Sequence, residues 1–414
     1  MPIKGNKSSK FLFFSFIQYI KIIFFSCSIF SSLVVFAGIF LQCNTSKTNI
    51  EQAIQIKGID DQASYNKNID ITINITDAIL RYDTISVLIN DQIVYREELL
   101  VIKKYTYQKY ITLKIETYKD GQYVFKVILT FRNKIIFENN KVFYIDRNPP
   151  VLKILNAVNH FRQGNTYQLQ VKSNENLDYF YCEFYNRKIK FYQQSEYVYC
   201  AFLSVPVKAK PNAFSIHLTA EDVAGNITKF ESEIIVHKKE FKTEHLWIPQ
   251  KKKHLLTDKN LANIMAKRLK RAFAHEEDRQ MWQGIFMRPV EGPVSSPFGK
   301  KRIYNKGVKY SVHYGLDIVN KEGTPVRSCA RGVITLAEEI PICGKTVIIH
   351  HGQKVFSIYQ HLSEIKVVTG QVVEKYLIIG HLGSTGQSTG PHLHWGMQVS
   401  GIYVNPEQWL KTLF

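Results

Sequence analysis

Histidine and aspartate residues occur in this sequence of 414 residues at spacings that suit a metal site. Near the C-terminus, His392 and His394 are separated by a single residue, and far upstream His313 precedes Asp317 in a His-x-x-x-Asp pattern. Catalytic zinc is typically held by three protein ligands, with a fourth position left for water. The two patterns therefore predict a zinc site, in which the histidines that are not ligands are free to move protons.

The spacing of the C-terminal pair also predicts its orientation. Side chains two positions apart on a strand point the same way, so we expect His392 and His394 to share a face, with Leu393 packed behind them. A single histidine is more often structural, but two in phase favour ligands, and His361 adds a further imidazole. Gly315, between the two upstream residues, lets the chain bend closely around the metal.

The segment that must position these residues, 286–414, is dense in glycine, valine, isoleucine and histidine. Short apolar stretches separated by glycine turns are typical of strands. We expect strands at 333–334, 346–349, 356–359 and 393–399. The sequence thus predicts a C-terminal antiparallel β domain with a groove.

The same segment resembles the lysostaphin-type (LytM-like) zinc endopeptidases, which cut peptidoglycan peptides. The resemblance rests on ordered blocks at 292–299, 313–317, 323–326, 332–333, 351–352, 359–362, 383–386, 389–394 and 405–406. It implies that His313, Asp317 and His394 bind one zinc ion per chain, and that His361 and His392 are the catalytic pair. In such a mechanism zinc polarises the scissile carbonyl and lowers the pKa of its water, while the histidines transfer protons. Which histidine is the base is left open.

Some relatives of this kind have lost ligands and serve as binding or activating proteins. All five matched positions keep their chemical type here, so the sequence favours a metallopeptidase acting on peptidoglycan crosslinks or bridges. A catalytically silent wall-binding scaffold or activator is the alternative, and a secreted lytic factor aimed at other cells is a third interpretation. In some relatives an asparagine before the first ligand blocks the open metal position, and whether Asn305 does so is left open.

The first segment, 1–43, reads as a cytoplasmic tail and a membrane anchor. Lys4, Lys7 and Lys10 precede an uncharged stretch at 22–41, and about 20 apolar residues can span a bilayer as a helix. The lysines predict a cytoplasmic N-terminus, which places the bulk of the chain outside the cytoplasm on a single-pass anchor. A lipoprotein ending at Cys43 and a cleaved signal peptide are the alternatives.

Between the anchor and the metal-site domain, the alternating pattern predicts two immunoglobulin-like β-sandwich units, 44–148 and 149–241, separated at Pro149 and Pro150. Asp120 and Gly121 signal a hairpin, and the turn at 222–226 resembles bacterial immunoglobulin-like modules. We expect these units to act as spacers rather than as wall-binding modules. A helical linker follows at 242–285, capped at Thr257 or Asp258, and we favour a solvated amphipathic helix over a docked lid.

The net charge of +19 favours an anionic neighbour, such as a wall polymer or a membrane surface. Export disfavours nucleic acid as a partner. Among the cysteines, Cys182 with Cys200 and Cys329 with Cys343 are candidate disulfides, and free buried thiols are equally expected.

Overall fold

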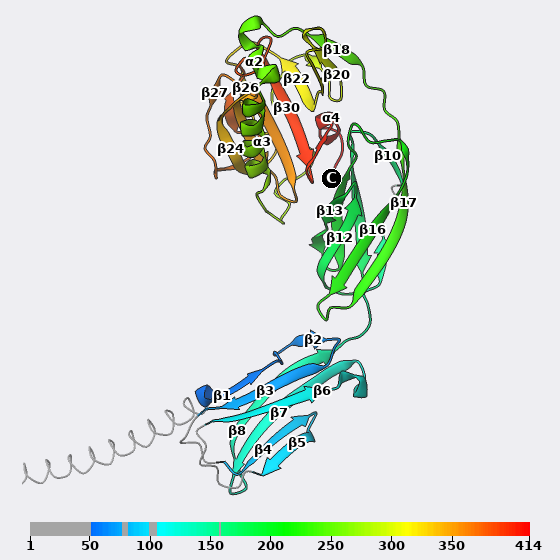
Figure 1. Ribbon diagram of the computed structural model, residues 1–414, viewed down its shortest axis with the longest axis vertical. Coiled ribbons are helices and arrows are strands. Elements are labelled where there is room, and N and C mark those ends of the chain that lie inside the picture. The colour runs from blue at the N-terminus through cyan, green and yellow to red at the C-terminus, as the bar shows by residue number, and fades with distance from the viewer. Residues whose placement is uncertain (1–50, 77–81, 99–105, 157–158) are drawn as a thin grey trace, which may run out of the picture. The chain divides into compact units, whose positions relative to one another are not determined.

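The computed structural model describes residues 51–414 except 77–81, 99–105 and 157–158. The chain is mainly β, as predicted, and it divides into two compact units, 1–147 and 148–414 (Figure 1). The division falls immediately before Pro149 and Pro150. Within the described ranges, no helix has the length and apolarity needed to span a membrane. The predicted anchor at 22–41 lies outside the described residues and stays a prediction.

The first unit contains eight strands and a short 3-10 helix among its described residues. They are β1 (Ile54–Lys57), β2 (Ala63–Tyr65), β3 (Ile69–Ile75), β4 (Thr84–Ile89), β5 (Gln92–Glu98), β6 (Tyr107–Leu113), η1 (Ile115–Thr117), β7 (Gly121–Phe131) and β8 (Lys134–Ile145).

These strands form two sheets, ordered β1-β3-β6 and β2-β8-β7-β4-β5, around one shared core. Alternation builds that core: Ile71 and Ile73 point inward from β3 and lie in one cluster with Val127 of β7. The hairpin expected at Asp120 and Gly121 is wrong, because β6 and β7 belong to different sheets. The local turn signal is real, but the chain uses it to cross between sheets after η1.

The second unit begins with another set of strands. They are β9 (Leu152–Ile154), β10 (His160–Arg162), β11 (Thr166–Ser173), β12 (Leu177–Phe184), β13 (Arg187–Lys190), β14 (Tyr192–Ser195), β15 (Val198–Ser204), β16 (Asn212–Asp222) and β17 (Ile227–His237).

These strands again form two sheets, β14-β15-β11-β9 and β10-β17-β16-β12-β13, over a common core. The predicted turn at 222–226 is confirmed. The Asp222 carboxylate accepts hydrogen bonds from the Ala224 and Asn226 backbone amides at 2.8 and 2.9 Å, which closes the β16–β17 hairpin. Cys182 and Cys200 are free buried thiols on strands of different sheets. The immunoglobulin-like assignment of both sandwiches stays a prediction.

The linker at 242–285 contains β18 (Thr243–Leu246), η2 (Gln250–Lys252), α2 (His254–Thr257) and α3 (Lys259–Phe273). Asp258 caps α3 as predicted, because its side chain accepts from the backbone amides of Asn260 and Leu261. The favoured solvated helix is wrong, since Ala272 and Phe273 pack against Phe356 of the following domain. The strand β18 was not predicted.

The C-terminal domain contains most of the remaining strands. The elements are β19 (Val294–Ser296), β20 (Lys301–Tyr304), η3 (Asn305–Gly307), β21 (Lys309–Val312), β22 (Gly315–Val319), β23 (Pro325–Arg327), β24 (Gly332–Ile340), β25 (Gly344–His350), β26 (Val355–Leu362), β27 (Glu364–Ile365), β28 (Val372–Val373), β29 (Ile378–His381), β30 (His392–Val399), β31 (Ile402–Val404) and α4 (Pro406–Trp409).

The main sheet of this domain runs β19-β22-β30-β26-β25-β24-β28, with β31 paired to β30. Its pairs are antiparallel, which confirms the prediction. Two smaller sheets, β18-β20-β21 and β23-β29-β27, flank it. The linker strand β18 therefore belongs to one of the sheets of the C-terminal domain.

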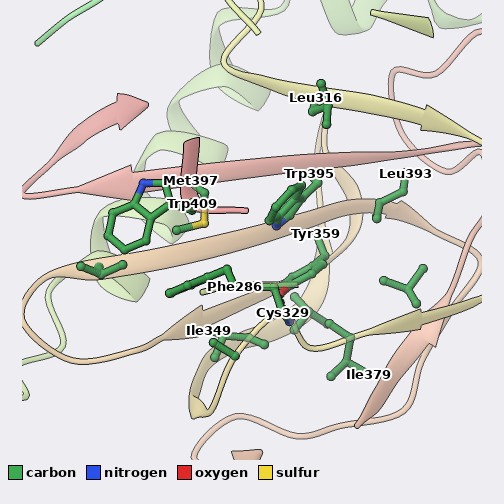
Figure 2. Close-up of a cluster of buried hydrophobic side chains, with 14 of the residues drawn as sticks. Phe286, Leu316, Cys329, Ile349, Tyr359, Ile379, Leu393, Trp395, Met397 and Trp409 are labelled. Carbon is green, nitrogen blue, oxygen red and sulfur yellow. Dashed lines mark hydrogen bonds between the residues drawn. The ribbon is translucent and has the colours of Figure 1, made fainter. Parts of the chain in front are cut away.

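The core of the domain lies on one face of the main sheet (Figure 2). Leu393, Trp395 and Met397 point into it from β30, and Trp409 of α4 packs against the same cluster. Phe202 of β15 also enters this core and lies 6.1 Å from Trp409 between ring centroids. The second sandwich and the C-terminal domain thus share buried side chains, in agreement with their membership of one compact unit.

Candidate metal centre

Two neighbouring strands bring the predicted ligands together on the opposite face of the sheet from the core. In the β22–β30 ladder, Asp317 lies opposite His394. His313 precedes β22, and its Nε2 lies 2.9 Å from Asp317 Oδ1 and 3.0 Å from His394 Nδ1. The third edge, from His394 Nδ1 to Asp317 Oδ1, is 2.9 Å. The structure therefore brings three candidate ligand atoms close to one point, and they belong to the three residues that the family resemblance implies.

This donor set fits a small divalent cation. Two imidazole nitrogens and one carboxylate oxygen are typical of catalytic zinc, whose bonds of about 2.0–2.1 Å set tetrahedral ligand atoms roughly 3.4 Å apart. Outward movements of a few tenths of an ångström would open the observed triangle to that size. His313 and Asp317 are buried, with 2% and 5% of their surface exposed, and movements of this size would leave both side chains buried.

Two of the ligand candidates, His313 and Asp317, have pKa values that favour the forms a metal needs. Burial lowers the pKa of His313 to about 4, so its imidazole is neutral at pH 7. Burial alone would raise the pKa of Asp317, but the imidazoles of His313 and His394 hold it well below its usual range. Neutral imidazoles and an ionised carboxylate are the metal-binding forms.

Local packing orients the two ligand imidazoles. His313 Nδ1 lies 3.0 Å from the Pro297 carbonyl oxygen, so this nitrogen can donate to the carbonyl while Nε2 would offer its lone pair to a bound metal. A Cβ atom on Gly315 would lie 2.5 Å from His394 Nε2 and 2.8 Å from the Trp395 carbonyl oxygen. Gly315 is thus needed for the close approach of the His394 ring, rather than for the bend that was expected.

The two predicted catalytic histidines lie beside this triangle. Their ring centroids are 4.9 Å apart, and His392 Nε2 is 3.8 Å from Asp317 Oδ1. Each Nδ1 contacts a backbone carbonyl at 2.8 Å, that of Thr385 for His361 and that of Gly390 for His392. Both histidines therefore donate through Nδ1 and retain an unprotonated Nε2. Burial lowers the pKa of His361 to about 3 and lowers that of His392 as well.

A bulge in β26 delivers His361 to the site. Strict alternation would place His361 on the core face with Tyr359, which is fully buried there. Instead, the β25–β26 register shifts between its Tyr359 and Leu362 pairs, and His361 has φ +65°. Non-glycine residues in this left-handed region are uncommon and often mark functional positions, and a bulge typically re-aims one side chain.

A cleft of about 410 Å³ opens over these residues. Asp317, His361 and His392 line it. One wall comes from the linker and the other from the loop before β30, and together these walls contribute Glu244, Leu246, Ile248, Gln387, Thr389 and Pro391. An extended peptide can therefore reach the metal position between two walls of different origin.

Comparison with known proteins agrees with this geometry. Residues 311–406 match Peptidase family M23. The C-terminal part of the chain is an M23 peptidase domain.

Curated relatives each match about a third of this chain, and two of them serve as examples. The DD-carboxypeptidase/endopeptidase Mpg of Neisseria meningitidis is 39% identical over 135 residues, which cover 32% of this chain and 31% of that protein. The peptidoglycan DD-endopeptidase ShyA of Vibrio cholerae is 36% identical over 134 residues, with the same coverage of 32% and 31%. The chain thus spans 31% of the length of each of these relatives. The solved catalytic domain of lysostaphin from Staphylococcus simulans is 29% identical, with a TM-score of 0.24, and the match covers 32% of this chain and 93% of that domain.

Asn305 of the M23 domain's N-terminal part does not point at the metal position. Its Oδ1 accepts from the Ile248 backbone amide at 2.7 Å, and its Nδ2 donates to the Ile248 carbonyl at 3.1 Å. Both ends of the amide are therefore occupied by the linker backbone. In this structure Asn305 fastens the linker to the domain.

Two residues that contact the ligands, and a third that contacts both of these, were not predicted from the sequence. Arg302 Nη2 donates to Asp317 Oδ2, Ser296 Oγ lies 3.3 Å from His313 Nδ1, and Glu244 contacts both Ser296 and Arg302. Ser296 lies in a block that carried the family resemblance. Arg302 and Glu244 could not be identified from the sequence, because neither belongs to a recognisable motif of spaced polar residues.

Proposed function

We propose that this protein is a zinc metalloendopeptidase that hydrolyses peptide crosslinks or bridges of bacterial peptidoglycan. The observation that carries the proposal is the convergence of His313 Nε2, Asp317 Oδ1 and His394 Nδ1 within 3.0 Å of one another, next to a cleft that Asp317 lines. The names of two relatives point to peptidoglycan and to D,D-bonds as the first substrates to test.

The metal would be held by His313, Asp317 and His394. Bound zinc supplies Lewis-acid polarisation of the scissile carbonyl and lowers the pKa of water. The remaining chemistry belongs to His361 and His392, whose unprotonated Nε2 atoms face the same site. One Nε2 accepts the proton of the attacking water, and the resulting imidazolium returns a proton to the leaving amine.

The carbonyl contacts of these two histidines support that role. When Nε2 becomes protonated, the Nδ1–H group still donates to Thr385 or Gly390, so the charged ring keeps its orientation. The carbonyl dipole also stabilises the developing positive charge. Burial holds both rings neutral at rest, so each Nε2 atom is unprotonated at pH 7.

We further propose that the protein is tethered to the cytoplasmic membrane by residues 22–41, with the rest of the chain outside the cytoplasm. The support is the sequence: an uncharged apolar stretch preceded by lysines. This position would place the M23 domain beside the wall, and the net charge of +19 suits anionic wall polymers.

The test is digestion of purified sacculi by the zinc-loaded protein. We expect solubilisation that a chelator stops and that added zinc restores. Zinc-loaded protein that binds sacculi without releasing any peptide would instead favour the wall-binding scaffold.

A further inference from the structure

A continuous hydrogen-bonded cluster links the linker strand β18 to the metal ligands. The Glu244 carboxylate accepts from Ser296 Oγ at 2.8 Å, from Lys300 Nζ at 3.0 Å and from Arg302 Nε at 3.2 Å. Glu244 therefore contacts each of the other three polar residues, which all belong to the C-terminal domain.

Two members of this cluster each touch a metal ligand. Ser296 Oγ lies 3.3 Å from His313 Nδ1, and Arg302 Nη2 donates to Asp317 Oδ2. The other carboxylate oxygen, Oδ1, faces the imidazoles. Arg302 Nη2 also donates to Ser296 Oγ at 3.0 Å. Outer contacts of this kind fix the orientation of ligands and tune metal affinity.

Strand pairing puts Glu244 in this position. The strands β18 and β20 lie side by side (Figure 1). In their parallel ladder, Glu244 lies opposite Arg302. Two further contacts hold the linker there: the Ile248 backbone pairs with the Asn305 amide, and Ile248 and Leu256 share a buried cluster with Tyr304.

The charges in the cluster are largely removed from water. Glu244, Arg302 and Asp317 side chains are 17%, 13% and 8% exposed. Removing one partner of such a set leaves the others uncompensated. Loss of Glu244 would release Arg302 and Ser296 from their anchor and would also leave excess positive charge beside a cation site. Both effects weaken cation binding.

We propose that Glu244 is a positioning residue of the metal centre, and that the linker strand β18 is a required part of that centre although it lies outside residues 311–406. The proposal rests on the proposed function, since it concerns the same metal site. It assigns the linker a role in metal affinity in addition to its role as a connection.

The experiment measures zinc affinity of the full chain by competition with a chromophoric chelator. We expect the apparent Kd to rise by about 10–100-fold in Glu244→Ala, the range found when outer-shell partners are removed, with a smaller rise in Glu244→Gln, which keeps the shape and one acceptor. Glu240→Gln is the matched control, because Glu240 is exposed and its ion pair is with Lys238. It should bind zinc as the wild type does.

A second readout separates positioning from general destabilisation. The visible absorption bands of the cobalt-substituted protein report ligand geometry, and we expect them to shift in Glu244→Gln and not in Glu240→Gln. Zinc affinities within twofold of wild type in both Glu244 variants, with unchanged cobalt bands, would overturn the proposal and leave the proposed function intact. Weakened zinc binding in the variants, together with a zinc-loaded wild type that cleaves nothing, would support the positioning role and overturn the proposed function.

Discussion

His394 and Asp317 are cross-strand partners, and the His394 Nδ1 atom lies 2.9 Å from Asp317 Oδ1. The register between β22 and β30 therefore sets the geometry of the metal site. A slip of one residue would turn one ligand toward the core, because side chains alternate between the faces of a sheet. The pairing of β22 with β30 therefore fixes the relative positions of these two metal ligands.

Replacing His313 by alanine should remove zinc and cleavage together. The triangle would keep only one imidazole and one carboxylate, so the affinity should fall further than the roughly 10–100-fold loss typical of outer-shell changes. Metal content by mass spectrometry and sacculus digestion would be measured on the same preparation. His381→Ala is the control, since His381 contacts Glu364 instead of the ligands, and it should retain both properties. Full activity in zinc-free His313→Ala would refute the ligand assignment.

Substituting Gly315 by alanine should displace the His394 ring. The added Cβ would lie 2.5 Å from His394 Nε2 and 2.8 Å from the Trp395 carbonyl oxygen, a backbone atom that cannot simply swing aside. We expect zinc affinity to drop by at least about tenfold, or about 1.4 kcal/mol. In Gly396→Ala the nearest contact is 3.4 Å, so that variant should bind zinc nearly normally. Equal affinities in the two variants would contradict the packing argument.

The free energy of unfolding should decrease as the pH is lowered, because His351 is buried in its uncharged form. Its Nδ1 contacts the Arg331 carbonyl at 2.8 Å, its Nε2 contacts Ser357 Oγ at 2.7 Å, and burial lowers its pKa to about 4. The unfolded chain takes up this proton near pH 6.5, whereas the folded protein does so only near the lower pKa. Stability from this group is therefore complete above pH 6.5 and is lost between 6.5 and about 4, at about 1.4 kcal/mol per pH unit.

The measurement is denaturant unfolding of the metal-free protein at a series of pH values between 7.5 and 5. His351→Asn should be less stable than wild type at pH 7.5 and should show a shallower pH dependence, by one proton. An identical slope in the variant would show that His351 does not titrate on unfolding.

Truncating Phe202 should destabilise the M23 domain as well as the second sandwich. The Phe202 ring is buried against Trp282, Trp409 and Phe414, so Phe202→Ala should cost about 3–5 kcal/mol. Phe230→Ala is the comparison, because that ring is 42% exposed. Near-ultraviolet circular dichroism of the tryptophans would report the M23 core during unfolding. A tryptophan transition that Phe202→Ala leaves unchanged would contradict the shared core.

The ligands could be predicted because their geometry is encoded locally. A two-residue strand period places His392 and His394 on one face, and the resemblance selects His394 as the ligand of this pair. The catalytic role of His361 came from the resemblance alone, since strict alternation places this residue on the core face and only the bulge in β26 turns it outward.

The linker's part in the site could not be predicted in the same way. Glu244 contacts Ser296, which lies 52 positions later in the sequence. The parallel pairing of β18 with β20 brings them together, and no turn motif in the sequence predicts such a pairing. The hairpin predicted at Asp120 and Gly121 was wrong because strand pairing again depends on tertiary packing. This dipeptide specifies a turn, but packing decides which sheet the next strand joins.

Mass spectrometry of peptidoglycan fragments tests the central claim most directly. Sacculi would be digested with zinc-loaded wild type and with His361→Asn, in which asparagine tolerates the left-handed backbone of that position. The account predicts new peptide termini at one type of crosslink or bridge with wild type, and about 10²–10⁴-fold slower release with a variant that still holds zinc. No new peptide termini from zinc-loaded wild type, or undiminished release by His361→Asn, would contradict it.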